Sequence, residues 1–273
     1  MAAIGQVLEQ ACARAPDAIV GSARAPLPWA LVTDPGPGRS HNEDRWRVDE
    51  ASGVFALADG MGGYNAGEVA SEIAARTVAE AVGALRAAGL SPADALRRAV
   101  SVAHRGIVDF AHTRPECLGM ATTLAVASVI AGRLAVAHVG DSRAYLFREG
   151  TLRRLTRDHS IGQQMLDAGR MTESQVRRLP ARGILTRALG IATEPPVADV
   201  AELDWQAGDL LLLCTDGLTD SLDDGRIAQT LADADAPLGR LASALIVAAS
   251  VHGCTDDATV LLVGGARAMP ASR

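Results

Sequence analysis

Residues 54–63 read VFALADGMGG: an apolar run reaches Asp59 and passes into a segment with four glycines between Asp59 and Glu68. A short apolar run bounded by glycine and aspartate predicts a buried β-strand. Glycine lets the backbone adopt a positive φ and come close to a ligand. We therefore expect a buried strand that ends on a carboxylate, followed by a loop whose carbonyls, such as that of Gly60, could ligate a metal.

Three other apolar runs carry an aspartate at one end in the same way: Asp141, Asp216 and Asp256. If these ends lie along one rim, the carboxylates converge and repel one another unless a cation lies among them. An all-oxygen set without clustered His or Cys favours Mg²⁺ or Mn²⁺ over zinc. A single Asp-Gly pair is ordinary turn chemistry, but the repeated pattern predicts a metal site.

A further cluster of charge lies upstream, where Arg39 precedes Asn42-Glu43-Asp44. The guanidinium of arginine is planar and permanently charged, and its fork suits a phosphate dianion. The alternative for Arg39 is a surface ion pair with Glu43, which would contribute little to stability.

The rest of the chain predicts a mixed α and β protein. Apolar runs predict strands at residues 29–33, 54–58, 123–130, 133–139, 144–148, 210–214 and 259–263, with hairpins at Ala131-Gly132 and at Gly140–Arg143. Helical periodicity predicts helices at residues 4–14, 66–88, 92–112, 158–168, 172–179 and 237–251. Regular βαβ alternation is missing, so antiparallel sheets are favoured over a doubly wound parallel sheet.

Composition excludes several classes of function. All 26 basic residues of the 273 are arginine. The absence of lysine excludes a Walker-A loop, Schiff-base chemistry and the kinase strand lysine. A net charge of −6 does not support nucleic-acid binding, and the apolar runs are too short for a membrane span. Four cysteines without CxxC spacing and the lack of a signal peptide favour reduced thiols in the cytoplasm.

The motifs, taken in order, resemble the PPM or type 2C family of metal-dependent serine/threonine protein phosphatases. The resemblance covers residues 29–264, which implies a helical lead-in at 1–28, a phosphatase domain at 29–264 and a tail at 265–273. The loop with Met61 is similar to the bacterial branch. The motifs that carry the resemblance are Arg39 with Asn42-Glu43-Asp44, Asp59–Gly63 with Gly67-Glu68 and Ala70-Ser71, Met120–Thr123, Gly140–Arg143, Leu155–Ser160, Leu185–Gly190, Thr215–Leu218 and Asp256–Thr259.

The resemblance implies a fold and a set of site residues. The fold would be an α+β, four-layer α/β/β/α sandwich with two central antiparallel sheets flanked by helices. Two tightly bound Mn²⁺ or Mg²⁺ ions and a third, weaker ion would be held by Asp59 as the bridging ligand, the carbonyl of Gly60, Asp216, Asp256, Glu43 directly or through water, and Asp141 at the weaker site. Arg39 would bind the substrate phosphate.

The implied reaction is hydrolysis of phosphoserine and phosphothreonine in proteins. Two hard cations about 4 Å apart lower the pKa of a water and clamp the phosphoryl oxygens, so that hydroxide attacks phosphorus in line. The protein supplies positioning and charge, and no covalent phosphoenzyme is needed. Such an enzyme would act in the cytoplasm on phosphorylated proteins and oppose a bacterial serine/threonine kinase, with no nucleic-acid or membrane partner.

Several positions depart from the family pattern. Met61 and Tyr64 stand where relatives carry histidine, so the proton donor stays open between Tyr64 and a metal-bound water. Asp257 replaces a common asparagine and is expected to be solvated. The flap, residues 169–187, has Leu179-Pro180 in place of His-Pro, and its five arginines against one glutamate form either a solvated face or a docking surface for acidic phosphoproteins.

The histidines are expected to be structural. His138 lies in an apolar run and is expected to be a buried, hydrogen-bonded core residue. His159 is placed to cap the helix that follows it. His104 and His112 lie on a predicted helix far in sequence from any motif.

Three alternative functions compete with this interpretation. A pseudophosphatase would bind phosphoproteins without turnover, although a binding module does not need converging carboxylates. A phosphatase of an anti-sigma-factor antagonist would share the chemistry, but the sequence offers no sensor domain. A two-metal nuclease is disfavoured by the acidic charge balance. Metal-dependent turnover of p-nitrophenyl phosphate separates an enzyme from a binding module.

Overall fold

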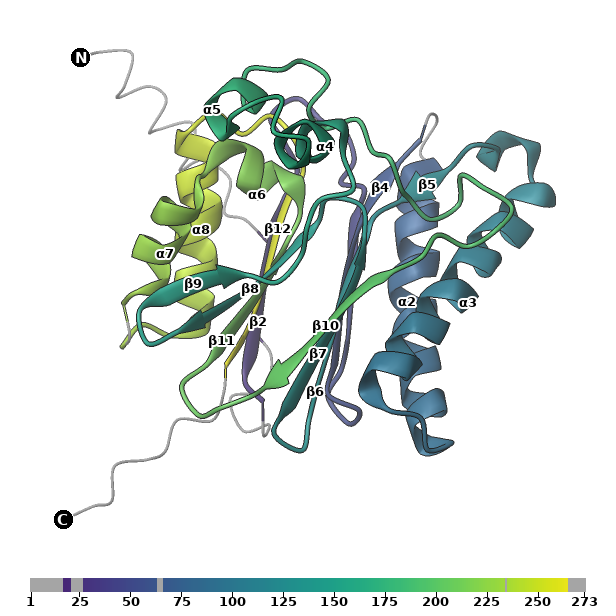
Figure 1. Ribbon diagram of the computed structural model, residues 1–273, viewed down its shortest axis with the longest axis horizontal. Helices are drawn as coiled ribbons and strands as arrows, with labels where there is room; N and C mark the ends of the chain where they lie inside the picture. Colours follow the sequence, from purple (N-terminus) through teal and green to yellow (C-terminus); the bar gives the residue numbers. More distant parts are fainter. Residues whose placement is uncertain (1–16, 21–26, 63–65, 234, 265–273) are drawn as a thin grey trace. The chain divides into compact units, whose positions relative to one another are not determined.

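The computed structural model describes residues 17–20, 27–62, 66–233 and 235–264 (Figure 1). The chain divides into two compact units, each with its own sheet and hydrophobic core. The first unit comprises Met1–Asn42, Tyr145–Arg153 and Trp205–Arg273, and the second comprises Glu43–Ala144 and Arg154–Asp204. The helix predicted at residues 4–14 lies outside the described residues, and the division into lead-in, phosphatase domain and tail stays a prediction.

The first unit contains a six-stranded sheet in the order β1-β2-β12-β11-β8-β9. Helices cover one face of it (Figure 1). Its longest helix, α8, buries Leu241, Leu245 and Ala249 at a helical spacing of four. The elements are β1 (Asp17–Val20), β2 (Trp29–Asp34), β8 (Arg143–Arg148), β9 (Thr151–Arg154), β11 (Leu210–Cys214), β12 (Ala258–Gly264), α6 (Asp216–Ser221), α7 (Asp224–Leu231) and α8 (Leu238–Val251).

The second unit contains a sheet in the order β10-β7-β6-β4-β3, with β5 paired to β4. Helices α2 and α3 pack together and cover one face of it (Figure 1). Small buried residues along α2, such as Ala70 and Ala74, permit this close packing. The elements are β3 (Asp44–Asp49), β4 (Val54–Met61), β5 (Ala121–Thr122), β6 (Leu124–Ile130), β7 (Arg133–Val139), β10 (Asp199–Asp204), α2 (Ala66–Ala87), α3 (Pro92–His112), α4 (Ile161–Asp167), α5 (Glu173–Val176) and the 3₁₀ turn η1 (Pro115–Cys117).

The predicted fold class is confirmed: two sheets with antiparallel pairing, flanked by helices, make this an α+β protein. The first predicted hairpin is also confirmed, because β6 pairs with β7 around Ala131 and Gly132, whose φ angles are 49° and 72°. Two consecutive positive φ angles are typical of the type I′ turn that matches strand twist. Helix α3 begins after Ser91, whose Oγ accepts a hydrogen bond from Asp94 N as the helix cap.

The second predicted hairpin is wrong. Strand β7 lies between β10 and β6 in the second unit's sheet, whereas β8 lies between β11 and β9 in the first. Gly140–Arg143 therefore carries the chain from one sheet to the other. Instead, β8 is followed by β9, and the two intervening residues, Glu149 and Gly150, have φ angles of 49° and 76°. The two-residue turn signal was at Glu149-Gly150, not at Gly140.

Two further differences have simple causes. The missed strands β3, β9 and β10 read DRWRVD, TLRR and DVAELD, so a search for apolar runs passes over them. The predicted cap for α4 is also wrong, because the Oγ of Ser160, not His159, accepts a hydrogen bond from Gln163 N at 3.3 Å. No helix within the described part of the chain is both long and apolar enough to cross a bilayer.

Candidate active site

Strand pairing in the second unit places three predicted ligands at one end of a β-ladder. Strands β3 and β4 are antiparallel with Asp44 opposite Asp59, so Glu43 and Gly60 meet just beyond that pair. The N–H of Gly60 donates to the carbonyl of Glu43 at 3.2 Å. Glu43, Asp59 and Gly60 are thus neighbours, as the resemblance implied.

Two glycines allow α2 to press against this strand end. A Cβ at Gly60 would lie 2.1 Å from the carbonyl oxygen of Gly67, and a Cβ at Gly67 would lie 2.7 Å from Oε1 of Glu43. The Oγ of Ser71, one turn further along α2, donates to the Glu43 carbonyl at 2.6 Å. These motif glycines therefore keep the space beside the Glu43 carboxylate free of side chains.

The predicted weak-site ligand Asp141 reaches the same end of this sheet. Strand β6 is antiparallel to both β4 and β7, so β4 and β7 run in the same direction. Asp59 lies near the end of β4, and Asp141 comes two residues after the end of β7. Thr123, which precedes β6, accepts a bond from Asp59 N at 3.0 Å and shares one of 2.7 Å with Ser142. Thr123 thereby ties the Asp59 and Asp141 segments together.

Ion pairs join two further motifs in the second unit. Arg143 contacts both carboxylate oxygens of Asp158 at 2.7 to 3.2 Å, in the bidentate geometry that favours arginine. Arg154 forms a second ion pair with Asp158. The aspartate of the Asp158-His159-Ser160 motif therefore anchors the Gly140–Arg143 segment, which is a structural role that the sequence did not reveal.

The first unit gathers the other predicted residues at one end of its own sheet. Strand β12 pairs with both β11 and β2, so the chain before Ala258 lies beside the end of β11 and the end of β2. Asp216 follows β11, Asp256 precedes β12, and Arg39 follows β2. The N–H of Thr259 donates to Oγ1 of Thr215, which fixes the start of α6 at that end.

Arg39 forms ion pairs inside this group. Its guanidinium lies 2.5 Å from Oδ1 of Asp256 and 3.6 Å from Oδ2 of Asp257. The Arg39 side chain remains 37% exposed, which leaves part of its fork accessible to a ligand.

The expectation that Asp257 is solvated is wrong. Asp257 is 2% exposed, and its Oδ1 accepts a hydrogen bond from Gly36 N at 3.2 Å. A Cβ at Gly217 would lie 2.2 Å from the Asp257 carbonyl oxygen, so the backbone passes closely here. Asp257 therefore holds the loop that carries Arg39. No local signal indicates this role, because Gly36 and Asp257 are 221 positions apart.

The structure assigns specific contacts to the histidines. His138 is buried, and its Nε2 lies 2.8 Å from the Arg157 carbonyl, which confirms the expected satisfied core residue. His104 is far in sequence from the motifs but not in space, because its Nδ1 accepts a hydrogen bond from Gly190 N at 3.2 Å. Burial lowers the pKa of both side chains, which favours the neutral imidazole.

The donor chemistry fits hard divalent cations. The second unit offers the carboxylates of Glu43, Asp59 and Asp141 with the carbonyl of Gly60, and the first unit offers Asp216 and Asp256. These are all oxygen donors of the kind that Mn²⁺ and Mg²⁺ prefer. Tyr64, the candidate proton donor, lies outside the described residues.

Comparisons with known proteins agree with this chemistry. The family model described as "Protein phosphatase 2C" matches residues 38–246. A serine/threonine phosphatase, stp, of Listeria welshimeri is 37% identical over 238 residues, which cover 85% of this chain and 93% of the relative. The serine/threonine protein phosphatase PstP of Mycobacterium tuberculosis is 36% identical over 86% of this chain and 44% of its own length.

Solved structures extend the likeness to three dimensions. The crystal structure of the M. tuberculosis phosphatase PstP/Ppp matches with a TM-score of 0.79 and 33% identity, over 91% of this chain and all of that one. A second structure, the catalytic domain of PstP in complex with two manganese ions, matches with a TM-score of 0.75 and 33% identity, over 87% of this chain and 97% of that one. By sequence and by structure, this chain belongs to the protein phosphatase 2C family.

Proposed function

We propose that this protein is a Mn²⁺- or Mg²⁺-dependent phosphatase that hydrolyses phosphoserine and phosphothreonine in proteins and so opposes a bacterial serine/threonine kinase. The observation that carries the proposal is the arrangement at the sheet end of the second unit, where Glu43, Asp59, Gly60 and Asp141 are held together by backbone pairing and hydrogen bonds. The relatives named serine/threonine phosphatases support the same reaction and substrate class.

We assign the metal ligands residue by residue. Asp59, the carbonyl of Gly60, Glu43, Asp216 and Asp256 would hold two ions, and Asp141 would contribute to a third, weaker one. When bound, such ions supply an activated water and neutralise the phosphoryl charge. The PstP structure with two manganese ions supports the choice of metal and the number two.

The protein's own contribution is to hold these oxygens in place. Thr123 and Ser71 fix the backbone on either side of the acidic group, and Gly67 leaves space beside Glu43. Positioning of this kind lowers the reorganisation needed when charge develops on the phosphoryl group. Arg39 would bind the substrate phosphate through its exposed fork, while Asp256 and Asp257 orient it. Whether Tyr64 or a metal-bound water protonates the leaving group stays a prediction.

We place this activity in the cytoplasm. The cysteines within the described residues, Cys117, Cys214 and Cys254, are all buried, which suits thiols that stay reduced in the cytoplasm. Burial raises the pKa of Cys254, which makes its thiol less reactive. The flap arginines Arg170, Arg177 and Arg178 are exposed and suit acidic phosphoprotein substrates.

The deciding experiment is metal-dependent turnover. Purified protein is assayed with a phosphothreonine peptide and with p-nitrophenyl phosphate in Mn²⁺, in Mg²⁺ and after chelation, with the Asp59→Asn variant alongside. We expect turnover of both substrates in Mn²⁺, little after chelation, and a loss of at least about 100-fold in the variant, as for removal of a group that stabilises transition-state charge. Peptide binding without turnover would establish the pseudophosphatase alternative instead.

A further inference from the structure

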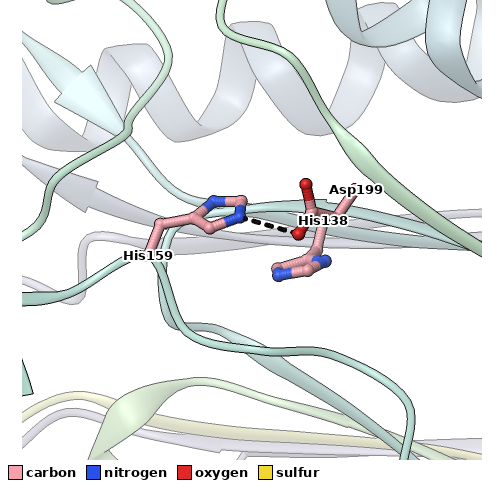
Figure 2. A group of neighbouring side chains, drawn as sticks. All are labelled: His138, His159 and Asp199. Atoms are coloured by element: carbon pink, nitrogen blue, oxygen red, sulfur yellow. Dashed lines mark ion pairs between the residues drawn. The ribbon is translucent and has the colours of Figure 1, made fainter. Parts of the chain in front are cut away.

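A compact group of side chains lies behind the Gly140-Asp141 segment in the second unit. Figure 2 shows His138 from β7, His159 from the segment before α4, and Asp199 from the start of β10. Strand pairing places Asp199 directly opposite His138. The two imidazole rings stack with centroids 4.6 Å apart and an interplanar angle of 17°. Both histidines are buried, and Asp199 is half exposed.

Two histidines and a carboxylate have the composition of a transition-metal site, but the hydrogen-bond directions argue against one. The N–H of Gly140 donates to Nδ1 of His159 at 3.1 Å, so Nδ1 carries no proton. The proton of the neutral ring is then on Nε2, which lies 3.3 Å from Oδ2 of Asp199. A metal on Nε2 would move that proton to Nδ1, where it would face the Gly140 N–H.

A cation is already present in the group. The guanidinium of Arg187 lies 3.0 Å from Oδ1 of Asp199 and 3.1 Å from Nε2 of His159. The positive charge of Arg187 compensates the negative charge of the Asp199 carboxylate. A metal ion is therefore not needed to neutralise that charge. The group is therefore better described as a hydrogen-bonded support than as a metal site.

His159 holds both polar groups of Gly140. Its side chain accepts from the Gly140 N–H, and its own backbone N–H donates to the Gly140 carbonyl at 2.9 Å. Gly140 has a φ of +100°, and a Cβ there would lie 2.7 Å from the side chain of Thr123. The residue immediately before Asp141 is thus fixed by Thr123 on one side and by His159 on the other.

We propose that His159 is a positioning residue: it fixes the Gly140-Asp141 segment at the end of β7, and Asp199, which is itself held by Arg187, fixes the orientation of its ring. The carbonyl of His159 also accepts a hydrogen bond from Thr186 N at 2.7 Å, at the end of the flap. His159 therefore links the flap to the segment that carries Asp141. The consequence for metal binding rests on the proposed function, in which Asp141 contributes to the weak ion site.

Two variants separate the two sides of the ring. In His159→Asn, the amide oxygen can take the place of Nδ1 and accept from Gly140 N–H, but it cannot reach Asp199. In His159→Gln, the longer amide can reach Asp199, but the acceptor for Gly140 is lost. A purely space-filling role for the ring would make the two variants alike, whereas the positioning role makes them differ at Gly140.

The main readout is amide hydrogen exchange at Gly140 in the metal-free protein, measured by NMR beside the wild type. We expect His159→Gln to exchange about tenfold faster at Gly140, as for loss of a hydrogen bond of typical net strength, and His159→Asn to stay close to the wild type. Circular dichroism and melting establish that each variant is folded. Arg187→Gln, a change at an exposed residue, is a second route if a His159 variant does not fold, and it should also raise exchange at Gly140.

The link to the proposed function has its own measurement. Calorimetric titration with Mn²⁺ should show weaker binding at the low-affinity site in His159→Gln and unchanged tight binding. His112→Asn, a change at an exposed histidine, is the control.

The outcomes separate the proposals. Equal Gly140 exchange in wild type, His159→Gln and Arg187→Gln would overturn the positioning role, even if wild-type turnover is normal. Unchanged weak-site affinity in His159→Gln would overturn the link to Asp141. Absence of metal-dependent turnover in the wild type would count against the proposed function alone.

Discussion

At the scale of single residues, the aspartates of this protein illustrate what local sequence can and cannot indicate. Four aspartates could be identified as candidate ligands from the sequence, because each adjoins an apolar run: Asp59, Asp141, Asp216 and Asp256. Asp257 adjoins the same run, yet its buried bond to Gly36 joins residues 221 positions apart, which no local pattern contains. A carboxylate that binds solvent and one that anchors a loop look identical until the chain folds.

The first prediction concerns Arg39. Arg39→Ala should raise KM for a phosphothreonine peptide more than it lowers kcat, because a phosphate fork contributes to ground-state binding as well as to the transition state. Arg39→Lys should recover little, because an ammonium lacks the bidentate geometry. Steady-state kinetics in Mn²⁺ test both variants, and full recovery with lysine would contradict the role of the fork.

At the scale of elements, apolar runs predicted strands well and sheet membership poorly. Strand β7 and helix α3 have the predicted bounds, because each is delimited by a strong local signal, a two-residue turn or a Ser-Pro cap. Strand β10 is half polar and has no such signal at its ends, so it was not predicted. The position of Asp199 at its start was therefore not predicted either. The partner of β8 depends on residues more than 60 positions away in β11, so the sequence around Gly140 could not specify it.

The second prediction concerns the contact between α2 and the end of β4. In an exposed helix, Gly→Ala stabilises by about 0.5–1 kcal/mol, but at Gly67 a Cβ would lie 2.8 Å from backbone atoms of Gly60 and Met61. We expect Gly67→Ala to lower the free energy of unfolding by about 1–3 kcal/mol and to reduce Mn²⁺-dependent turnover by displacing Glu43. Urea unfolding and activity assays measure these effects.

Gly106→Ala in α3 is the matched control for Gly67→Ala. Its nearest contact would be a methyl group of Ile73 at 3.4 Å, which has room to adjust. This variant should be neutral or slightly stabilising and fully active. If both variants behaved alike, close packing at Gly67 would not be what positions Glu43.

The third prediction is a dependence of stability on pH that comes from β7. Burial holds the pKa of His138 below its ordinary value of 6.5. As the pH falls, the His138 imidazole is therefore protonated in the unfolded chain before it is protonated in the folded protein. The His138 contribution to stability is therefore complete above about pH 6.5 and is lost on acidification below it. In the metal-free protein, His138→Gln should lose less unfolding free energy between pH 7.5 and pH 5 than the wild type, by up to about 1.4 kcal/mol for each unit of pKa lowering.

The replacement is chosen to keep the local hydrogen bond. The amide nitrogen of glutamine can donate to the Arg157 carbonyl, as Nε2 of His138 does, but it does not titrate. His104 has a lowered pKa as well and is present in both proteins, so its contribution cancels in the comparison. His159, whose pKa is lowered by burial and by the adjacent His138, loses that neighbour in the variant, which changes the pH dependence in the same direction. Urea titrations at the two pH values provide the measurement, and identical pH dependence would show that His138 is not buried as a neutral ring.

At the scale of the whole molecule, each sheet is built from segments that are far apart in the chain. The first unit combines three separate stretches and the second combines two. The proposed ligands follow the same rule, since Asp216 and Asp256 are brought to one sheet end by the pairing of β11 with β12. Within each unit, the proposed oxygen donors are therefore close together only in the folded chain, and metal binding should depend on folding.

The last prediction follows from that dependence. A ligand that binds only the folded state stabilises it by about 2.7 kcal/mol at 100 times its dissociation constant, which for a chain of this size raises Tm by roughly 5–10 °C. Saturating Mn²⁺ should produce such a shift in the wild type and a similar one in Asp141→Ala, which lacks only the proposed weak site. Asp59→Asn should show almost no shift, yet its metal-free Tm should equal or exceed that of the wild type, because one of several neighbouring anions is gone. Differential scanning calorimetry with and without Mn²⁺ measures all three proteins, and an undiminished shift in Asp59→Asn would remove Asp59 from the tight metal pair.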